Sequence, residues 1–106
     1  MTWQRDRDLG FEEQFAHREE QEFKAAAHRN RLLGRWAAQK MGLEGGAAES
    51  YVASLVTGDV AHLRGHGVID KVIQDLKAAG ATFTEVEVRG AFERFDRDAA
   101  HEVKQG

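Results

Sequence analysis

The stretch that decides the fold class is VIDKVIQDLKAAG, residues 68–80. Its apolar side chains follow the spacing i, i+3, i+4, i+7, which gathers them on one face of an α-helix. They are Ile69, Val72, Ile73 and Leu76. Gly80 follows directly, and glycine readily takes the left-handed conformation in which helices often end. The stretch therefore predicts an amphipathic helix over about Val68 to Ala79.

The segment after Gly80 has two interpretations. Residues 81–88 alternate well enough to suggest a strand, but Thr84 and Glu87 have the spacing of a helix capping box. The apolar residues that follow keep helical spacing: Val88, Phe92, Phe95, Ala99 and Val103. A single strand would also have no partner in the chain. We therefore expect a helix here.

Two further helices are expected before residue 68. The shorter spans about Ala47 to Val56, with Ala48, Val52, Leu55 and Val56 on one face. The longer spans about Phe11 to Met41 and is followed by Gly42, a suitable carboxyl-terminal cap. Its apolar positions are Phe11, Phe15, Phe23, Ala26, Ala27, Leu33, Trp36 and Ala37. Residues 59–67 are interpreted as a connector.

The composition agrees with a helical protein and excludes several classes of function. The 106 residues include no proline, which favours long helices, and no cysteine, which excludes disulfides and thiolate chemistry. The formal charge is -3, with acidic and basic residues interleaved, so no basic face suggests nucleic acid. The polar amino terminus is unlike a signal peptide, and no apolar run approaches the roughly 18 residues of a membrane span. We expect a cytoplasmic protein without direct membrane insertion.

Four amphipathic helices with short connections predict an all-α four-helix bundle. The first helix, about 31 residues long, would reach roughly 46 Å, whereas the second and third would reach only about 15–20 Å. Its amino-terminal part is therefore expected to extend beyond its neighbours. We predict a mobile arm over residues 1–18 and a bundle over residues 19–106.

Candidate chemical motifs are weak. His62 and His66 have the i, i+4 spacing of two metal ligands, but Gly65 and Gly67 make a helix doubtful there and no further ligand completes a site. The glycines do not match a phosphate-binding loop, and the serines lack a nucleophile context. We expect no catalytic site, no metal and no cofactor. A bundle that binds a small ligand such as a nucleotide remains the alternative to a protein-binding regulator.

The predicted arm carries Phe11 and Phe15 one helical turn apart among alternating charges. Such i, i+4 apolar anchors are typical of a helix that docks in the groove of a partner. An ordinary frayed terminus would have the same composition. The residue pattern alone leaves both interpretations open.

Several motifs in the first half of the chain carry a family resemblance. They are Phe15-Ala16-His17, Glu19-Glu20, Phe23-Lys24-Ala25, Arg29-Asn30-Arg31-Leu32-Leu33-Gly34 and Trp36-Ala37-Ala38. Together they closely resemble the signature of the zeta subunits, the ATPase inhibitors of the F-type ATP synthase of alphaproteobacteria. The similarity covers the whole chain, including a Gly-His turn near Gly65-His66 and a helix that ends at Gly80.

The resemblance implies a regulatory inhibitor that is a monomer when free. In this family the amino-terminal segment is thought to become helical as it enters a catalytic α/β interface and approaches the γ shaft, blocking rotation in the hydrolytic direction. The bundle would rest on the outside of the catalytic head, at the periphery of the membrane-bound synthase. On this chain the partner-binding residues would be Trp3, Asp6, Arg7, Asp8, Leu9, Phe11, Glu12, Glu13, Phe15 and His17.

Overall fold

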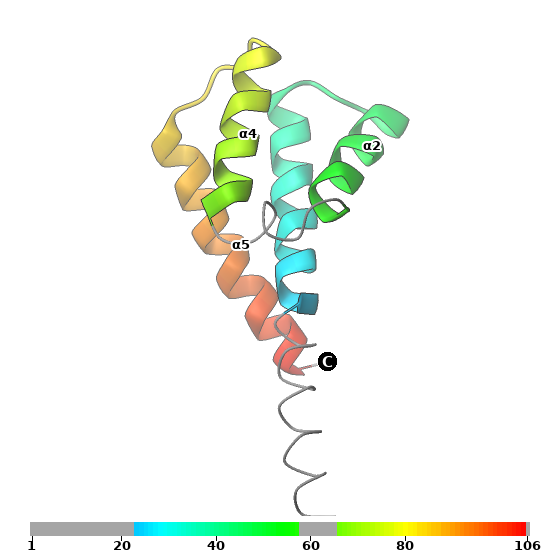
Figure 1. Cartoon of the computed structure of the whole chain (residues 1–106), viewed down its shortest axis with the longest axis vertical. Coiled ribbons are helices and arrows are strands. Elements are labelled where there is room, and N and C mark those ends of the chain that lie inside the picture. Colours follow the sequence, from blue (N-terminus) through cyan, green and yellow to red (C-terminus); the bar gives the residue numbers. More distant parts are fainter. Residues whose placement is uncertain (1–22, 58–65, 106) are drawn as a thin grey trace, which may run out of the picture.

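The structure, a computed structural model, describes residues 23–57 and 66–105 (Figure 1). Within these ranges the chain forms four helices and no strand. They are the helix over residues 23–40, α2 (Gly45–Val56), α4 (His66–Ala78) and α5 (Glu85–Gln105). This confirms the all-α four-helix bundle and the helical interpretation of the last segment. Residues 11–22, the expected start of the first helix, lie outside the described residues.

The 23–40 helix lies at the centre of the bundle. In Figure 1, α2 lies on one side of it and α4 and α5 lie on the other. The α-carbon of Val52 in α2 is so close to Gly34 that a Cβ built on this glycine would lie 3.1 Å from it. On the opposite side, Lys40 forms an ion pair with Glu87 of α5. The central helix thus contacts neighbours on both flanks.

Two glycines end helices in the way that the sequence predicts. Gly42 and Gly80 have φ angles of 75° and 70°, in the left-handed region that glycine adopts without steric cost. The amide after Gly42 donates to the carbonyl of Ala38 at 2.9 Å, and the amide after Gly80 donates to that of Leu76 at 3.0 Å. This hydrogen-bond pattern is a Schellman cap, which satisfies carbonyls in the last turn of each helix.

The predicted capping box starts α5. The backbone amide of Glu87 donates to Oγ1 of Thr84 at 3.1 Å, an interaction that typically stabilises a helix by about 1 kcal/mol. The Glu87 carboxylate accepts a hydrogen bond from Nζ of Lys40 at 2.7 Å. This bond, assisted by Thr84, lowers the pKa of Glu87. The same residue therefore caps α5 and joins it to the end of the central helix.

The core lies between the 23–40 helix, α4 and α5, with one large side chain from α2. All four residues predicted for the apolar face of α4 are buried. The fully buried large side chains are Leu33, Leu55, Ile69, Leu76, Val68, Val72 and Val88. Sequence periodicity therefore identified the inner face of α4 correctly.

The apolar face predicted for α2 is only partly covered, and so is Trp36. Leu55 is fully buried, but Val52 and Val56 keep part of their surface exposed. Trp36 has the helical spacing of a core residue in the first predicted helix, but it is only partly buried and packs against the core without entering it. The reason is geometric, because the described helices cover one side of the contact between α2 and the central helix and leave the other side open.

The limits of two helices differ slightly from their predicted ranges. α4 begins at His66, inside the predicted connector, and includes Gly67. A glycine is tolerated in the first turn, where backbone amides have no partner within the helix. α2 begins at Gly45, two residues before its predicted start. Among the helices of the described ranges, none is both long and apolar enough to cross a membrane.

Candidate functional site

Every residue of the expected inhibitory segment lies outside the described residues. This holds for Trp3, Asp6, Arg7, Asp8, Leu9, Phe11, Glu12, Glu13, Phe15 and His17, and for the predicted arm boundary at residue 18. Their roles stay predictions. What the structure does describe is the body to which this segment is attached, with one face built around buried polar groups and another that forms an open groove.

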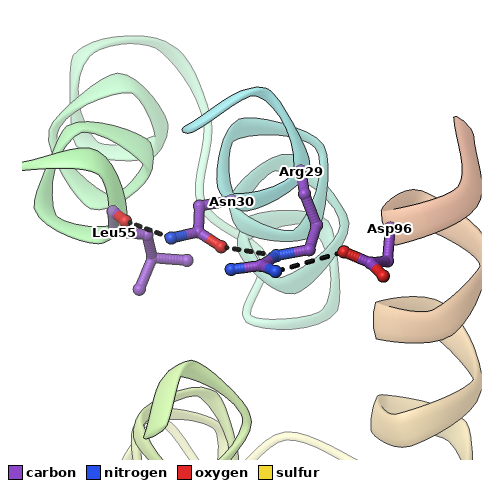
Figure 2. A network of polar contacts seen from close by, with 4 residues as sticks. All are labelled: Arg29, Asn30, Leu55 and Asp96. Carbon is purple, nitrogen blue, oxygen red and sulfur yellow. Dashed lines mark hydrogen bonds and ion pairs between the residues drawn. The ribbon is translucent and has the colours of Figure 1, made fainter. Parts of the chain in front are cut away.

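The buried polar groups are Arg29 and Asn30, adjacent in the central helix and only 6% and 2% exposed. Nη1 of Arg29 donates to Oδ1 of Asp96 in α5 at 3.1 Å, and Nε donates to Oδ1 of Asn30 at 3.1 Å. Nδ2 of Asn30 donates to the carbonyl of Leu55 in α2 at 3.0 Å. Figure 2 shows the resulting chain of contacts from α2 through the central helix to α5.

This network joins three helices because its side chains bind partners on both neighbouring helices. The Leu55 carbonyl lies in the last turn of α2, where carbonyls have no partner within the helix, and Asn30 supplies one. The Arg29 guanidinium also lies over the ring of Phe92, with Cζ 4.6 Å from the ring centroid. Buried polar groups are costly unless they are hydrogen-bonded, and both side chains meet this condition.

Gly34 lies one turn further along the same helix and lets α2 approach closely. A Cβ on this glycine would meet the Val52 α-carbon at 3.1 Å and the side chain of Leu55 at 3.3 Å. Such distances leave no room for a larger side chain without displacing α2. The motif Arg29 to Gly34, which carries the family resemblance, is thus the segment that positions α2 against the central helix.

The sequence pattern does not predict the structural roles of Arg29 and Asn30. A signal for Asn30 exists, because asparagine is a poor helix former and here it lies in a helix interior beside the buried Leu33. Such a residue on a buried face indicates a hydrogen bond to another element. Its partner, Leu55, is 25 residues away and could not be named from spacing.

A second connection joins α2 to α4. The Tyr51 hydroxyl donates to Oδ2 of Asp75 at 2.9 Å, and Nζ of Lys71 donates to the same oxygen at 2.9 Å. Burial raises the pKa of Tyr51, and the hydrogen bond to Asp75 raises it further. The tyrosine therefore remains a neutral donor throughout the physiological pH range.

The open face of the bundle carries a groove of about 860 Å³. The central helix forms its floor, α2 forms one wall, and α5 contributes the other side. Its principal lining side chains are Arg31, Leu32, Arg35 and Trp36 from the floor, Val52 and Val56 from α2, and Arg94 and Phe95 from α5. We call this surface the arginine groove. The sequence pattern does not predict this groove.

The part of the chain that the structure describes contains no assembled metal site. No group of three or more His, Asp or Glu side chains is arranged there to hold an ion. His66 begins α4, whereas His62 lies outside the described residues, so the spacing noted for this pair is not tested.

The described residues form an all-α bundle whose helices are joined by polar contacts and whose surface carries an open groove. Such an architecture is suited to binding other molecules at its surface. The model of the family "ATPase inhibitor subunit zeta" matches residues 1–102, and the chain belongs to this family. The match covers both the predicted arm and nearly all of the bundle. No curated protein and no solved structure matches the chain.

Proposed function

We propose that this chain is a regulatory inhibitor of the F-type ATP synthase and has no catalytic activity of its own. The observation that carries the proposal is the family match over residues 1–102, which includes the arm as well as the bundle. The described structure supports it, because the signature motif from Arg29 to Gly34 has a coherent role in building the bundle.

The proposed mechanism assigns inhibition to residues 1–18. This arm folds into a helix as it enters a catalytic α/β interface, and it reaches toward the γ subunit. Phe11 and Phe15 are its apolar anchors, one turn apart. Ordering the arm costs conformational entropy, which buried apolar contacts and charge pairs must offset. The docked arm then blocks rotation in the hydrolytic direction because that rotation requires a conformation that the docked state disfavours.

The bundle has a separate role in this proposal. It binds the outside of the catalytic head and keeps the arm close to its site, at the periphery of the membrane-bound synthase on the cytoplasmic side. Tethering raises the effective concentration of the arm, so a weakly binding segment can still occupy its site. A rigid body serves this purpose well, and the buried network of Arg29 and Asn30 supplies that rigidity.

The test is ATP hydrolysis by the purified F-type ATPase of an alphaproteobacterium, titrated with the full-length chain. We expect saturable inhibition, and we expect the double substitution Phe11→Ala and Phe15→Ala to weaken it by roughly tenfold or more, as the loss of anchor residues does. The matched control replaces two exposed apolar residues of the bundle, Phe23 and Val86, which are 50% and 80% exposed. This control should inhibit like the wild type.

Two results would contradict the proposal at different levels. Absence of inhibition by the full-length chain at saturating concentration would remove the inhibitory function. Equal inhibition by the wild type and by the Phe11 and Phe15 double variant would leave the function standing and remove these anchors.

A further inference from the structure

The arginine groove concentrates positive charge on a protein whose formal net charge is -3. Arg31, Arg35 and Arg94 line it, and Glu49 is the one acidic side chain of this lining within the described residues. None of the three guanidinium groups forms an ion pair with a described residue. Arg29, two residues from Arg31, is by contrast paired with Asp96. The Arg94 guanidinium lies over the ring of Phe95, with Cζ 4.7 Å from the ring centroid, a contact that leaves its charge available to a carboxylate. The groove therefore presents cations that an acidic partner could pair with.

Apolar side chains lie between these cations. Leu32 and Trp36 on the floor and Phe95 on the α5 side are each only partly buried. Val52 and Val56 continue the apolar surface on α2. Tryptophan and arginine are the residue types that most often dominate the energy of protein interfaces. Their combination here is typical of a binding surface and is unlike ordinary solvated surface.

The shape of the groove favours a helix as its occupant. Its floor runs along the central helix from Arg31 to Gln39, a distance of about 12 Å or roughly two helical turns. It is open to solvent, whereas small-ligand sites usually enclose most of the ligand surface. An amphipathic helix laid along this floor would place residues at i, i+3, i+4 and i+7 against Trp36 and Phe95.

We propose that the arginine groove docks an acidic amphipathic helix of the ATP synthase catalytic head, which anchors the bundle independently of the arm. This inference rests on the proposed function and adds to it the surface of attachment and the chemistry of the partner segment. Apolar residues of that segment contact Trp36 and Phe95. Acidic residues on its two flanks pair with Arg35 of the central helix and Arg94 of α5.

The experiment measures the affinity of the full-length chain for the purified catalytic head by biolayer interferometry at low and high salt. The groove variant carries Arg35→Glu and Arg94→Glu. The control variant carries Arg89→Glu and Arg97→Glu, which make the same charge change at exposed positions of α5 outside the groove. Thermal melting of all three chains verifies that the bundle is intact.

We expect the groove variant to bind at least roughly tenfold more weakly than the wild type at low salt and to differ less from it at high salt, because salt screens the repulsion between the new glutamates and the acidic partner. The control variant should bind within about twofold of the wild type, since charges outside an interface contribute little. Equal weakening of the two variants would overturn the proposal, because it would reveal a response to net charge alone.

Other occupants of the groove give different outcomes. If the wild type bound ADP and the groove variant did not, while both bound the head with the same affinity, the groove would be a small-anion site and the docking proposal would be wrong. If wild-type chains self-associated in sedimentation and the groove variant did not, with affinity for the head unchanged, the occupant would be a second copy. A wild type that neither binds nor inhibits the head would overturn the proposed function as well. A groove variant that binds and inhibits the head as well as the wild type does would overturn this inference alone.

Discussion

The central helix has two faces that use the same residue types differently. Its closed face, formed by Arg29, Asn30, Leu33, Gly34 and Ala37, is buried against the other helices. Its groove face, formed by Arg31, Leu32, Arg35, Trp36 and Gln39, remains at least partly exposed. Two residues along an α-helix correspond to a rotation of about 200°, so Arg29 and Arg31 point to opposite environments. Position around the helix therefore decides whether an arginine stabilises the fold or is available to a partner.

The two faces should respond to substitution in opposite ways. Changes on the closed face should lower the free energy of unfolding, because they remove buried contacts or overfill the packing. Changes on the groove face should leave that free energy nearly unchanged and alter binding instead. Matched pairs of substitutions, one on each kind of surface, separate these responses.

The largest effect is expected at Gly34. Gly34→Leu should destabilise the bundle by about 3 kcal/mol, because its side chain must displace Val52 and Leu55. The control is Gly90→Leu in α5, where a Cβ meets nothing within 4 Å. It should stabilise the protein by about 0.5–1 kcal/mol through helix propensity. Chemical denaturation measures both, and similar changes at the two glycines would refute the close approach of α2.

The next effect compares two arginines. Arg29→Met should cost about 2 kcal/mol, since it removes charge-assisted hydrogen bonds while keeping the apolar part of the side chain. Arg35→Met, the same change on the groove face, should alter the free energy of unfolding by no more than about 0.5 kcal/mol. Equal costs for the two substitutions would remove the distinction between the faces.

A pair of amides gives a smaller difference. Asn30→Ala should cost about 1.5 kcal/mol, because the Leu55 carbonyl and the Arg29 Nε both lose a partner. Gln39→Ala on the groove face should be neutral or slightly stabilising, as alanine is the better helix former. Urea denaturation curves test this directly, and a neutral Asn30→Ala would mean that the network contributes nothing to stability.

The smallest effect depends on pH and concerns the attachment of α2 to α4. Tyr51→Phe should cost about 1 kcal/mol near neutral pH by removing the hydrogen bond to Asp75. The pKa of Tyr51 is raised in the folded protein, so its contribution is complete below the unfolded value of about 10 and is lost as the pH rises above it. The stability difference between wild type and variant should therefore shrink above that pH. A difference that is constant across the alkaline range would contradict the assignment.

Much of the fold could be predicted because local rules determine it. The buried face of α4, the glycine caps at Gly42 and Gly80, and the capping box of Thr84 and Glu87 each depend on residues within one or two turns. Family membership was likewise recognisable from motifs distributed along the chain. These features need no knowledge of how the helices pack.

Features that depend on packing could not be predicted. Arg29 and Asp96 are 67 residues apart, and their contact requires the relative rotation of two helices. Trp36 has the spacing of a core residue, yet its exposure depends on how far α2 extends around the central helix. The arginine groove is missed for the same reason. The roles of the arm residues stay predictions, since these residues lie outside the described ranges.

One measurement tests most directly whether the arm inhibits and the bundle anchors. It is ATP hydrolysis by the purified catalytic head, titrated with the full-length chain and with the chain lacking residues 1–17. The truncated chain retains every described residue and should melt like the full-length chain. We predict that the full-length chain inhibits hydrolysis, whereas the truncated chain does not inhibit and instead competes with it for the head. Equal inhibition by the truncated chain would contradict this division of roles, because the bundle would then be the inhibitor.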